Sequence, residues 1–201
     1  MSAPPASFYF DLASPLAYLA AEQILHVLPG PAEWQPVLAR DLAGGEPHDA
    51  FRCREEQEIF QAEIARRAGE LDLQLLRWPQ PFPFDSTIAM RVATYAKSIG
   101  RIVPFAQAAF RQAFAGARNL EQADNVLIAA AACEMHPAAV LRGSELRSVA
   151  ERLAAVTTAA SRAGIIKVPA IVVGEQVFEG ERAIEQAAAQ MTATAAPGGA
   201  R

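Results

Sequence analysis

FYFDLASPLAYLA, residues 8–20, changes from a strand pattern to a helix pattern within a few residues. Phe8–Asp11 is aromatic and apolar and ends in a carboxylate, which predicts a short buried strand. After a turn at Ala13, Ser14 and Pro15 match the N-cap and the first position of a helix. Because a helix N-terminus concentrates unpaired N–H groups and positive dipole, Ser14 lies where an anion is favoured. A helix cap without further function is the alternative interpretation.

The 201 residues, 52 % hydrophobic and 20 % charged, are enough for one globular core or for a core with a large insertion. The net charge of −4 gives no basic footprint, so we expect no nucleic-acid partner. No run approaches the ~18 apolar residues of a membrane span, so we expect no membrane partner. The N-terminus MSAPPAS lacks the features of a signal peptide, which favours a cytoplasmic protein.

Cysteine and histidine spacing gives no sign of a metal site. Cys53 and Cys133 form no Cys-x-x-Cys pair, and no histidine stands at a metal-ligand spacing from them. We therefore expect no metal and two reduced structural or surface thiols.

The two ends of the chain carry the strand signals. Helical spacing continues the first helix to about Leu28, and Trp34–Leu38 is a second strand, which together predict a β-α-β unit. Near the C-terminus, Ala170–Val173 and Gln176–Phe178 predict a tight β-hairpin before a final helix over about 181–191.

Residues 41–164 have hardly any strand signal and predict an all-helical insertion domain. The predicted helix starts are Asp49, Asp85 or Ser86, Val103, Asn119 (a capping box with Gln122) and Ser144. In the second of these helices, Ile88, Val92, Tyr95 and Ile99 are expected to face inward. Without this block, 1–40 and 165–201 have the β-α-β and β-β-α order of a thioredoxin-like α/β domain with a mixed sheet.

Three segments resemble a known family: FDLASPLAYLA (10–20), WPQPFPFDSTIAMR (78–91) and GIIKVPAIVVGEQVFEGER (164–182). They look like the DsbA-like family, and within it the branch of 2-hydroxychromene-2-carboxylate isomerases and kappa-class glutathione transferases. The resemblance covers about residues 7–190. It implies a thioredoxin-like fold in which Pro169, immediately before the third strand, is the cis-proline that faces the active-site helix.

The resemblance also implies a glutathione site. Ser14 and Ala17 stand where redox members carry Cys-x-x-Cys, so thiol–disulfide exchange through that motif is impossible here. In the isomerase branch the matching serine hydrogen-bonds the glutathione sulfur and favours its thiolate. The backbone of Val168 would pair with the cysteinyl backbone. Glu181 and Arg182 would hold the γ-glutamyl end.

The implied activity is glutathione-dependent cis–trans isomerisation of a small aromatic carboxylate. The thiolate adds to a conjugated system, a bond rotates and the thiolate leaves. Phe82, Phe84 and Tyr18 are candidates to line the substrate site, with core packing as the alternative. Lys167, beside the cis-proline, could meet an anionic substrate or cofactor carboxylate. Relatives of this branch are commonly dimers, so we expect a homodimer.

Departures from the family pattern leave alternatives open. The loop GGEPHD (44–49) has Glu46 where an asparagine is usual, Glu181 replaces an aspartate, and Lys167 replaces a small residue. Another small thiol would explain these changes. The enzymatic alternative is a kappa-like transferase or peroxidase. A thioredoxin-like binding module without catalysis is the alternative from another class.

Overall fold

In the part of the chain that the structure describes, four short strands form one mixed sheet in the order β2-β1-β3-β4. The structure, a computed structural model, describes residues 5–44, 51–180 and 182–195. The strands are β1 (Ala6–Phe10), β2 (Ala32–Pro36), β3 (Ala170–Val173) and β4 (Gln176–Glu179). β1 pairs parallel with β2 and antiparallel with β3, and β3 pairs antiparallel with β4. The predicted thioredoxin-like sheet, built from both ends of the chain, is confirmed.

The sheet is held by aromatic packing along β1. Its residues alternate between buried and half-buried positions, as expected for a strand with one face in the core. The ring of Phe8 meets Trp34 of β2 edge to face at 4.9 Å between centroids, and Phe10 lies 5.8 Å from Phe110. These contacts connect the sheet to a helix that comes a hundred residues later.

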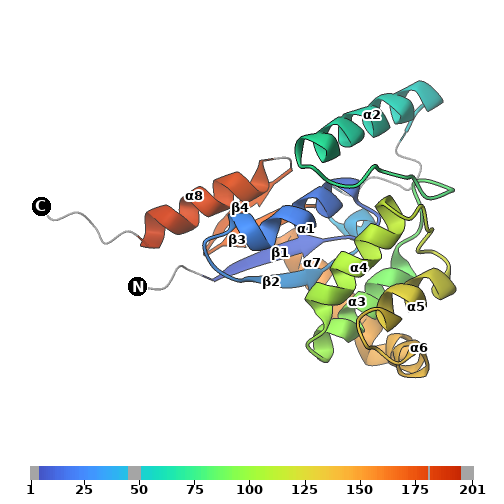
Figure 1. Ribbon diagram of the computed structural model, residues 1–201. Helices are drawn as coiled ribbons and strands as arrows, with labels where there is room; N and C mark the ends of the chain where they lie inside the picture. The colour runs from blue at the N-terminus through green and yellow to red at the C-terminus, as the bar shows by residue number, and fades with distance from the viewer. Residues whose placement is uncertain (1–4, 45–50, 181, 196–201) are drawn as a thin grey trace, which may run out of the picture.

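Helices cover both faces of the sheet (Figure 1). α1 (Pro15–Val27) and α8 (Ala183–Ala195) lie side by side on one face, and α7 (Arg147–Arg162) runs behind the other. The remaining helices are η1 (Ala39–Asp41), α2 (Arg54–Glu70), α3 (Thr87–Ser98), α4 (Ile102–Phe114), α5 (Ala123–Ala131) and α6 (Pro137–Glu145). α3 to α6 pack together at one end of the sheet, and α2 crosses above α1.

Two predicted helix starts are wrong. α5 begins after Gln122, and the Asn119 side chain does not cap it, because its Oδ1 accepts from the Glu121 N–H at 2.8 Å. Ser144 lies inside α6, where its hydroxyl donates to the Leu141 carbonyl at 3.0 Å. α6 was missed because it is only nine residues long and begins at His136-Pro137, without a conventional cap.

The inward face of α3 agrees with the prediction only in part, since Val92 is buried and Tyr95 half-buried. Ile88 and Ile99 are 42 % and 47 % exposed, while the alanines at 89, 93 and 96 are buried. Small side chains allow α4, α6 and α7 to approach α3 closely, so the alanine face is the one that packs. The predicted cap Asp49 lies outside the described residues, and α2 begins at Arg54.

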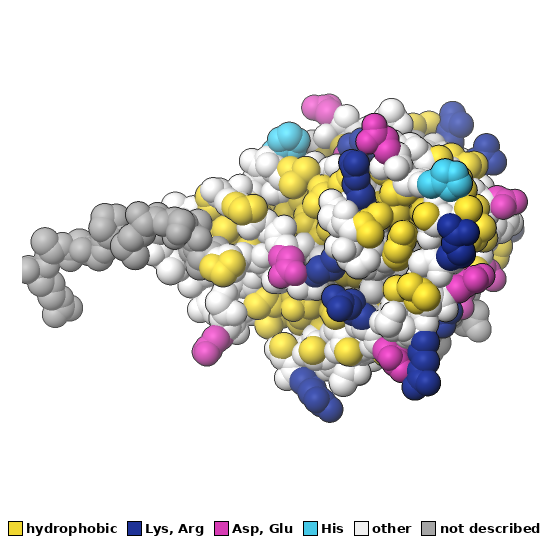
Figure 2. Space-filling model, turned by 90° about the horizontal axis from the view of Figure 1, so that it is seen from below, with side chains coloured by type: hydrophobic (Ala, Val, Ile, Leu, Met, Phe, Trp, Pro, Cys, Tyr) yellow, Lys and Arg dark blue, Asp and Glu magenta, His cyan; other side chains and the backbone are white. Residues whose placement is uncertain are grey.

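The surface is mixed in character. Figure 2, which views the molecule from below, shows apolar side chains interspersed with charged groups of both signs. In the described parts of the chain, no helix is both long enough and apolar enough to cross a membrane.

Candidate active site

Ser14 caps α1 at the point where the chain leaves β1. Its backbone N–H donates to the Asp11 carbonyl at 3.0 Å, which closes the turn. Its Oγ accepts from the Ala17 N–H at 3.2 Å, and Pro15 takes the first helical position. Because a hydroxyl can accept and donate at once, the Ser14 hydrogen can still be given to an anion in front of the helix.

A cleft of about 500 Å³ opens in front of Ser14. On one side lie Ile166, Lys167 and Val168, the residues that precede Pro169. The other residues that line it are Asp11, Ala13, Leu16, Ala39, Arg40, Gly44, Phe51, Glu56, Phe60, Phe82, Pro83 and Ser86. Its size and mainly apolar lining are typical of a small-molecule site.

Three phenylalanines form an aromatic wall of this cleft. Phe51 lies 5.3 Å from Phe60 and 6.2 Å from Phe82 between ring centroids. Trp78 supports the wall from behind, because its ring meets Phe82 at 4.8 Å. A planar ligand can pack on such a wall by edge or offset contacts. Phe82 thus lines the cleft, and its role at a substrate site stays a prediction.

Charged groups lie at the cleft as well. The Arg40 guanidinium donates to Asp85 at 2.8 Å and to the Thr87 hydroxyl at 2.6 Å. Lys167 is exposed, and Asp11 is only 3 % exposed. Burial raises the pKa of the Asp11 carboxyl, while its hydrogen bonds and the Arg40 charge lower it in part. The cleft thus combines an apolar wall with charged groups of both signs, since Glu56 lines it as well.

The loop before Pro169 is fixed by Glu179. One carboxylate oxygen of Glu179 accepts from the N–H groups of Ile166 at 2.7 Å and Lys167 at 3.1 Å. The Val168–Pro169 peptide bond is cis. Among the described residues, none hydrogen-bonds to the Val168 backbone. That backbone can therefore pair with an extended ligand, as an edge strand does.

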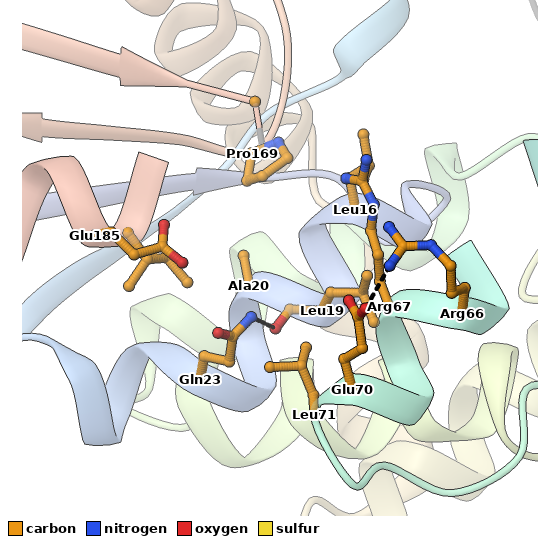
Figure 3. A pocket seen from close by; sticks show the side chains of 12 residues that line it. Leu16, Leu19, Ala20, Gln23, Arg66, Arg67, Glu70, Leu71, Pro169 and Glu185 are labelled. Atoms are coloured by element: carbon orange, nitrogen blue, oxygen red, sulfur yellow. Dashed lines mark hydrogen bonds and ion pairs between the residues drawn. The ribbon is translucent and has the colours of Figure 1, made fainter. Parts of the chain in front are cut away.

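A second cavity of about 270 Å³ adjoins the cleft (Figure 3). Leu16 lines both, and Pro169 of this cavity directly follows Val168 of the cleft. Its polar side chains come from α1, α2 and α8: Gln23, Arg66, Arg67, Glu70 and Glu185. Arg66 forms an ion pair with Glu70, as Figure 3 shows. Together the two cavities offer an apolar compartment and a polar one, on either side of the cis-proline loop.

Two predicted substrate-lining residues are corrected. Tyr18 is 2 % exposed and stacks on Phe114 at 5.6 Å, because residue 18 of α1 faces α4 and not the cleft. Phe84 is 1 % exposed and lies in the core. The predictions for Glu46 and Glu181 fall outside the described residues. Arg182 is exposed and lines neither cavity described above.

Sequence reasoning missed several cleft residues. Asp11 was recognised only as the carboxylate that ends a strand, although a buried acid three residues before a helix cap is a signal for a site. Phe51 and Phe60 stand in or beside an otherwise polar helix, where large aromatic side chains need an apolar neighbour. In the described ranges, no group of three or more His, Cys, Asp or Glu could hold a metal ion.

The fold resembles those of several solved proteins. A 2-hydroxychromene-2-carboxylate isomerase superposes with a TM-score of 0.82 at 15 % identity, covering 94 % of this chain and 95 % of that one. A probable DsbA oxidoreductase from Streptomyces coelicolor gives 0.78 at 18 % identity, covering 96 % and 92 %. The cytosolic disulfide reductase DsbM from Pseudomonas aeruginosa, solved with GSH, gives 0.66 at 12 % identity, covering 94 % and 96 %.

At such identities these likenesses concern the fold alone. Among curated protein sequences, none matches this chain significantly. The sequence does match the family described as DSBA-like thioredoxin domain over residues 7–192, which is nearly the whole chain. With its mixed sheet, its capped helix and its cis-proline loop, the chain belongs to the DSBA-like thioredoxin domain family.

Proposed function

We propose that this protein is a glutathione-dependent cis–trans isomerase of the 2-hydroxychromene-2-carboxylate isomerase type. One observation carries the proposal: the Ser14 hydroxyl, at the N-terminus of α1, lines the same cleft as Val168 and an aromatic wall. The isomerase named among the structural neighbours supports this type of activity as a hypothesis.

The chemistry of Ser14 favours an external thiolate. A hydroxyl that donates to sulfur and a helix N-terminus both stabilise the negative charge, and both lower the pKa of a bound thiol. Ser14 and Ala17 offer no sulfur of their own. The nucleophile must therefore be brought by a bound small molecule, which is the role proposed for glutathione.

The two cavities suggest how the ligands divide the site. The cysteinyl backbone of glutathione would pair with the Val168 backbone, and a polar end of the tripeptide would occupy the 270 Å³ cavity beside Arg67 and Gln23. An aromatic substrate would pack on Phe51, Phe60 and Phe82 in the larger cleft. Its carboxylate would then meet Lys167.

The reaction needs no redox step. The thiolate forms a C–S bond with the terminal carbon of a conjugated enone and pushes an electron pair onto the carbonyl oxygen, so that the former double bond becomes single. After rotation about this bond, the electron pair returns, the C–S bond breaks and the thiolate is released unchanged. Ser14 stabilises the sulfur at the start and at the end of this cycle.

Calorimetric titration of glutathione between pH 6 and 9 tests the proposal. We compare the wild type, Ser14→Ala and Ser14→Thr, because threonine keeps both the hydroxyl and the cap. Wild type and Ser14→Thr should release a proton on binding near neutral pH, seen as a heat that depends on the buffer. Ser14→Ala should bind without that release and lose about 1 kcal/mol of stability with its cap.

Other outcomes separate the alternatives. Proton release with conjugation of chlorodinitrobenzene but no isomerisation would identify a kappa-like transferase or peroxidase. If glutathione fails to bind but another low-molecular-weight thiol binds with the same proton release, the cofactor is that thiol. If no thiol binds and Ser14→Ala changes only stability, the protein is a binding module. Use of glutathione would also favour a cytoplasmic location, where thiols such as Cys53 and Cys133 stay reduced.

A further inference from the structure

Asp11 is a buried acid at the candidate site that the proposed reaction does not use. It directly follows β1, lines the 500 Å³ cleft and is only 3 % exposed. Buried carboxylates are costly unless several donors satisfy them. The contacts of Asp11 therefore indicate what the residue does.

The Asp11 carboxylate joins three segments that form the floor of the cleft. Oδ1 accepts from the Ala13 N–H at 2.9 Å, in the turn before α1. Oδ2 accepts from the Ala39 N–H at 2.9 Å, at the start of η1. The Ser86 side chain, immediately before α3, also interacts with this carboxyl and lowers its pKa. In addition, the Asp11 carbonyl accepts from the Ser14 N–H at 3.0 Å.

We propose that Asp11 is a positioning residue that holds the Ser14 hydroxyl and the first turn of α1 at the cleft. This inference rests on the proposed function in one respect: the group that Ser14 stabilises is a thiolate. Asp11 acts through the Ala13–Ser14 turn and does not contact the sulfur. Without the carboxylate, the turn would lose its connection to η1 and α3, and the hydroxyl would no longer be held at one place.

An amide cannot replace this carboxylate. Both backbone partners, at Ala13 and Ala39, are donors, and each needs an acceptor oxygen. An asparagine side chain at this position would offer one oxygen and one NH₂ group, so one backbone N–H would face another donor. Protonation of Asp11 has a similar but weaker effect, because one carboxyl oxygen then carries a hydrogen and accepts less well from its backbone N–H. The other charged residues that line the cleft are Arg40, Lys167 and Glu56, and the charge of Arg40 acts on the Asp11 carboxyl.

The first test uses the protein without any ligand. The amide NMR signals of Ala13 and Ala39 are followed against pH in the wild type and in Asp11→Asn. In the wild type both signals should shift with one common midpoint, because both report on the same carboxyl group. That shared midpoint should be absent in the variant. Separate midpoints in the wild type would overturn the inference, whatever the protein binds.

The second test measures thiolate absorbance near 240 nm of bound glutathione against pH, with the affinity for S-methylglutathione measured alongside. In Asp11→Asn the midpoint should rise by about one pH unit, which is about tenfold less thiolate at pH 7. The affinity for S-methylglutathione, which has no ionisable thiol, should change less than threefold. Ser86→Ala, which removes one donor and keeps the others, should shift the midpoint in the same direction by less.

Glu22→Gln is the matched control. Glu22 is a largely buried carboxylate on the same helix as Ser14, paired with Arg111 at 2.6 Å, and it lines neither cavity. It should lose stability and leave the thiol midpoint unchanged. If Asp11→Asn folds and its thiol midpoint is unchanged, the positioning role is overturned. If Asp11→Asn does not fold, an unchanged thiol midpoint in Ser86→Ala overturns it. If the wild type binds no thiol, the proposed function fails, and the amide titration alone decides whether Asp11 holds the turn.

Discussion

Gly44→Ala should disturb the candidate site through a single close contact. Gly44 lies in the cleft wall after η1, directly against the loop that precedes Pro169. A Cβ at this position would lie 2.7 Å from the Ile166 carbonyl oxygen and 2.9 Å from its Cβ. Gly44 is not among the glycines with positive φ, so the variant tests close packing and not backbone conformation.

The size of the effect follows from these distances. Ordinary van der Waals contact begins at 3.4 Å, so the Ile166 backbone must move by about 0.7 Å, since neither contact atom belongs to a flexible side-chain end. Overpacking of this kind costs about 1–3 kcal/mol. For a chain of this length that corresponds to a fall in Tm of roughly 2–12 °C. Because Val168 moves with Ile166, affinity for the thiol should fall on the order of tenfold.

Thermal unfolding by circular dichroism and calorimetric titration of glutathione measure the two effects. Gly69→Ala is the matched control, because nothing lies within 4 Å of a Cβ at that position of α2. Alanine there should raise stability by up to about 1 kcal/mol through helix propensity and leave binding unchanged. A Gly44→Ala protein with wild-type Tm would refute the packing geometry. A lowered Tm with unchanged thiol affinity would refute the role of the Ile166–Val168 backbone.

Three further predictions concern other parts of the molecule. Phe82→Ala should raise KM for an aromatic substrate about tenfold or more, measured by steady-state kinetics, and leave glutathione affinity within twofold, measured by calorimetry. If the affinities for substrate and glutathione fell equally, a separate aromatic compartment would be contradicted. Tyr18→Phe should leave activity within twofold of the wild type, because this ring is in the core. A large loss of activity would instead indicate that the Tyr18 hydroxyl contributes to the site. Burial alone would raise the pKa of Asp85, but hydrogen bonds from Thr87 and Arg40 hold it at about 2, below its ordinary 3.8. The stabilisation by Asp85 is therefore present above about pH 4 and lost as pH falls towards 2, so denaturant unfolding in this range should be less pH-dependent for Asp85→Asn than for the wild type.

The parts of the fold that sequence could predict are those set by local chemistry. The Ser14-Pro15 helix start and the hairpin that joins Ala170–Val173 to Gln176–Phe178 both depend on one or two residues with strong conformational preferences. Each was predicted from those residues alone. The pairing of the two chain ends into one sheet followed from the order of the elements.

Features that depend on contacts between distant elements could not be predicted from the sequence. Large apolar residues at 88 and 99 suggested the inward face of α3, but the alanine face is buried because three helices crowd against it. Tyr18 and Phe84 were candidates for the substrate site by their proximity in sequence to Ser14 and Phe82. Only the tertiary packing of α4 shows that Tyr18 points elsewhere.

The two sides of the candidate site come from different parts of the chain, and this division has a consequence for specificity. Ser14 and Val168 belong to the sheet and its connections, where hydrogen bonds such as those of Asp11 and Glu179 leave little freedom. The aromatic wall comes from Phe51, Phe60 and Phe82, which lie in or beside α2 and the segment after it. Substitutions in that wall can change the substrate without moving the groups that are proposed to hold a thiolate. Exchange of the wall between members of this family should therefore alter substrate preference, while the thiol ionisation that we propose for Ser14 stays the same.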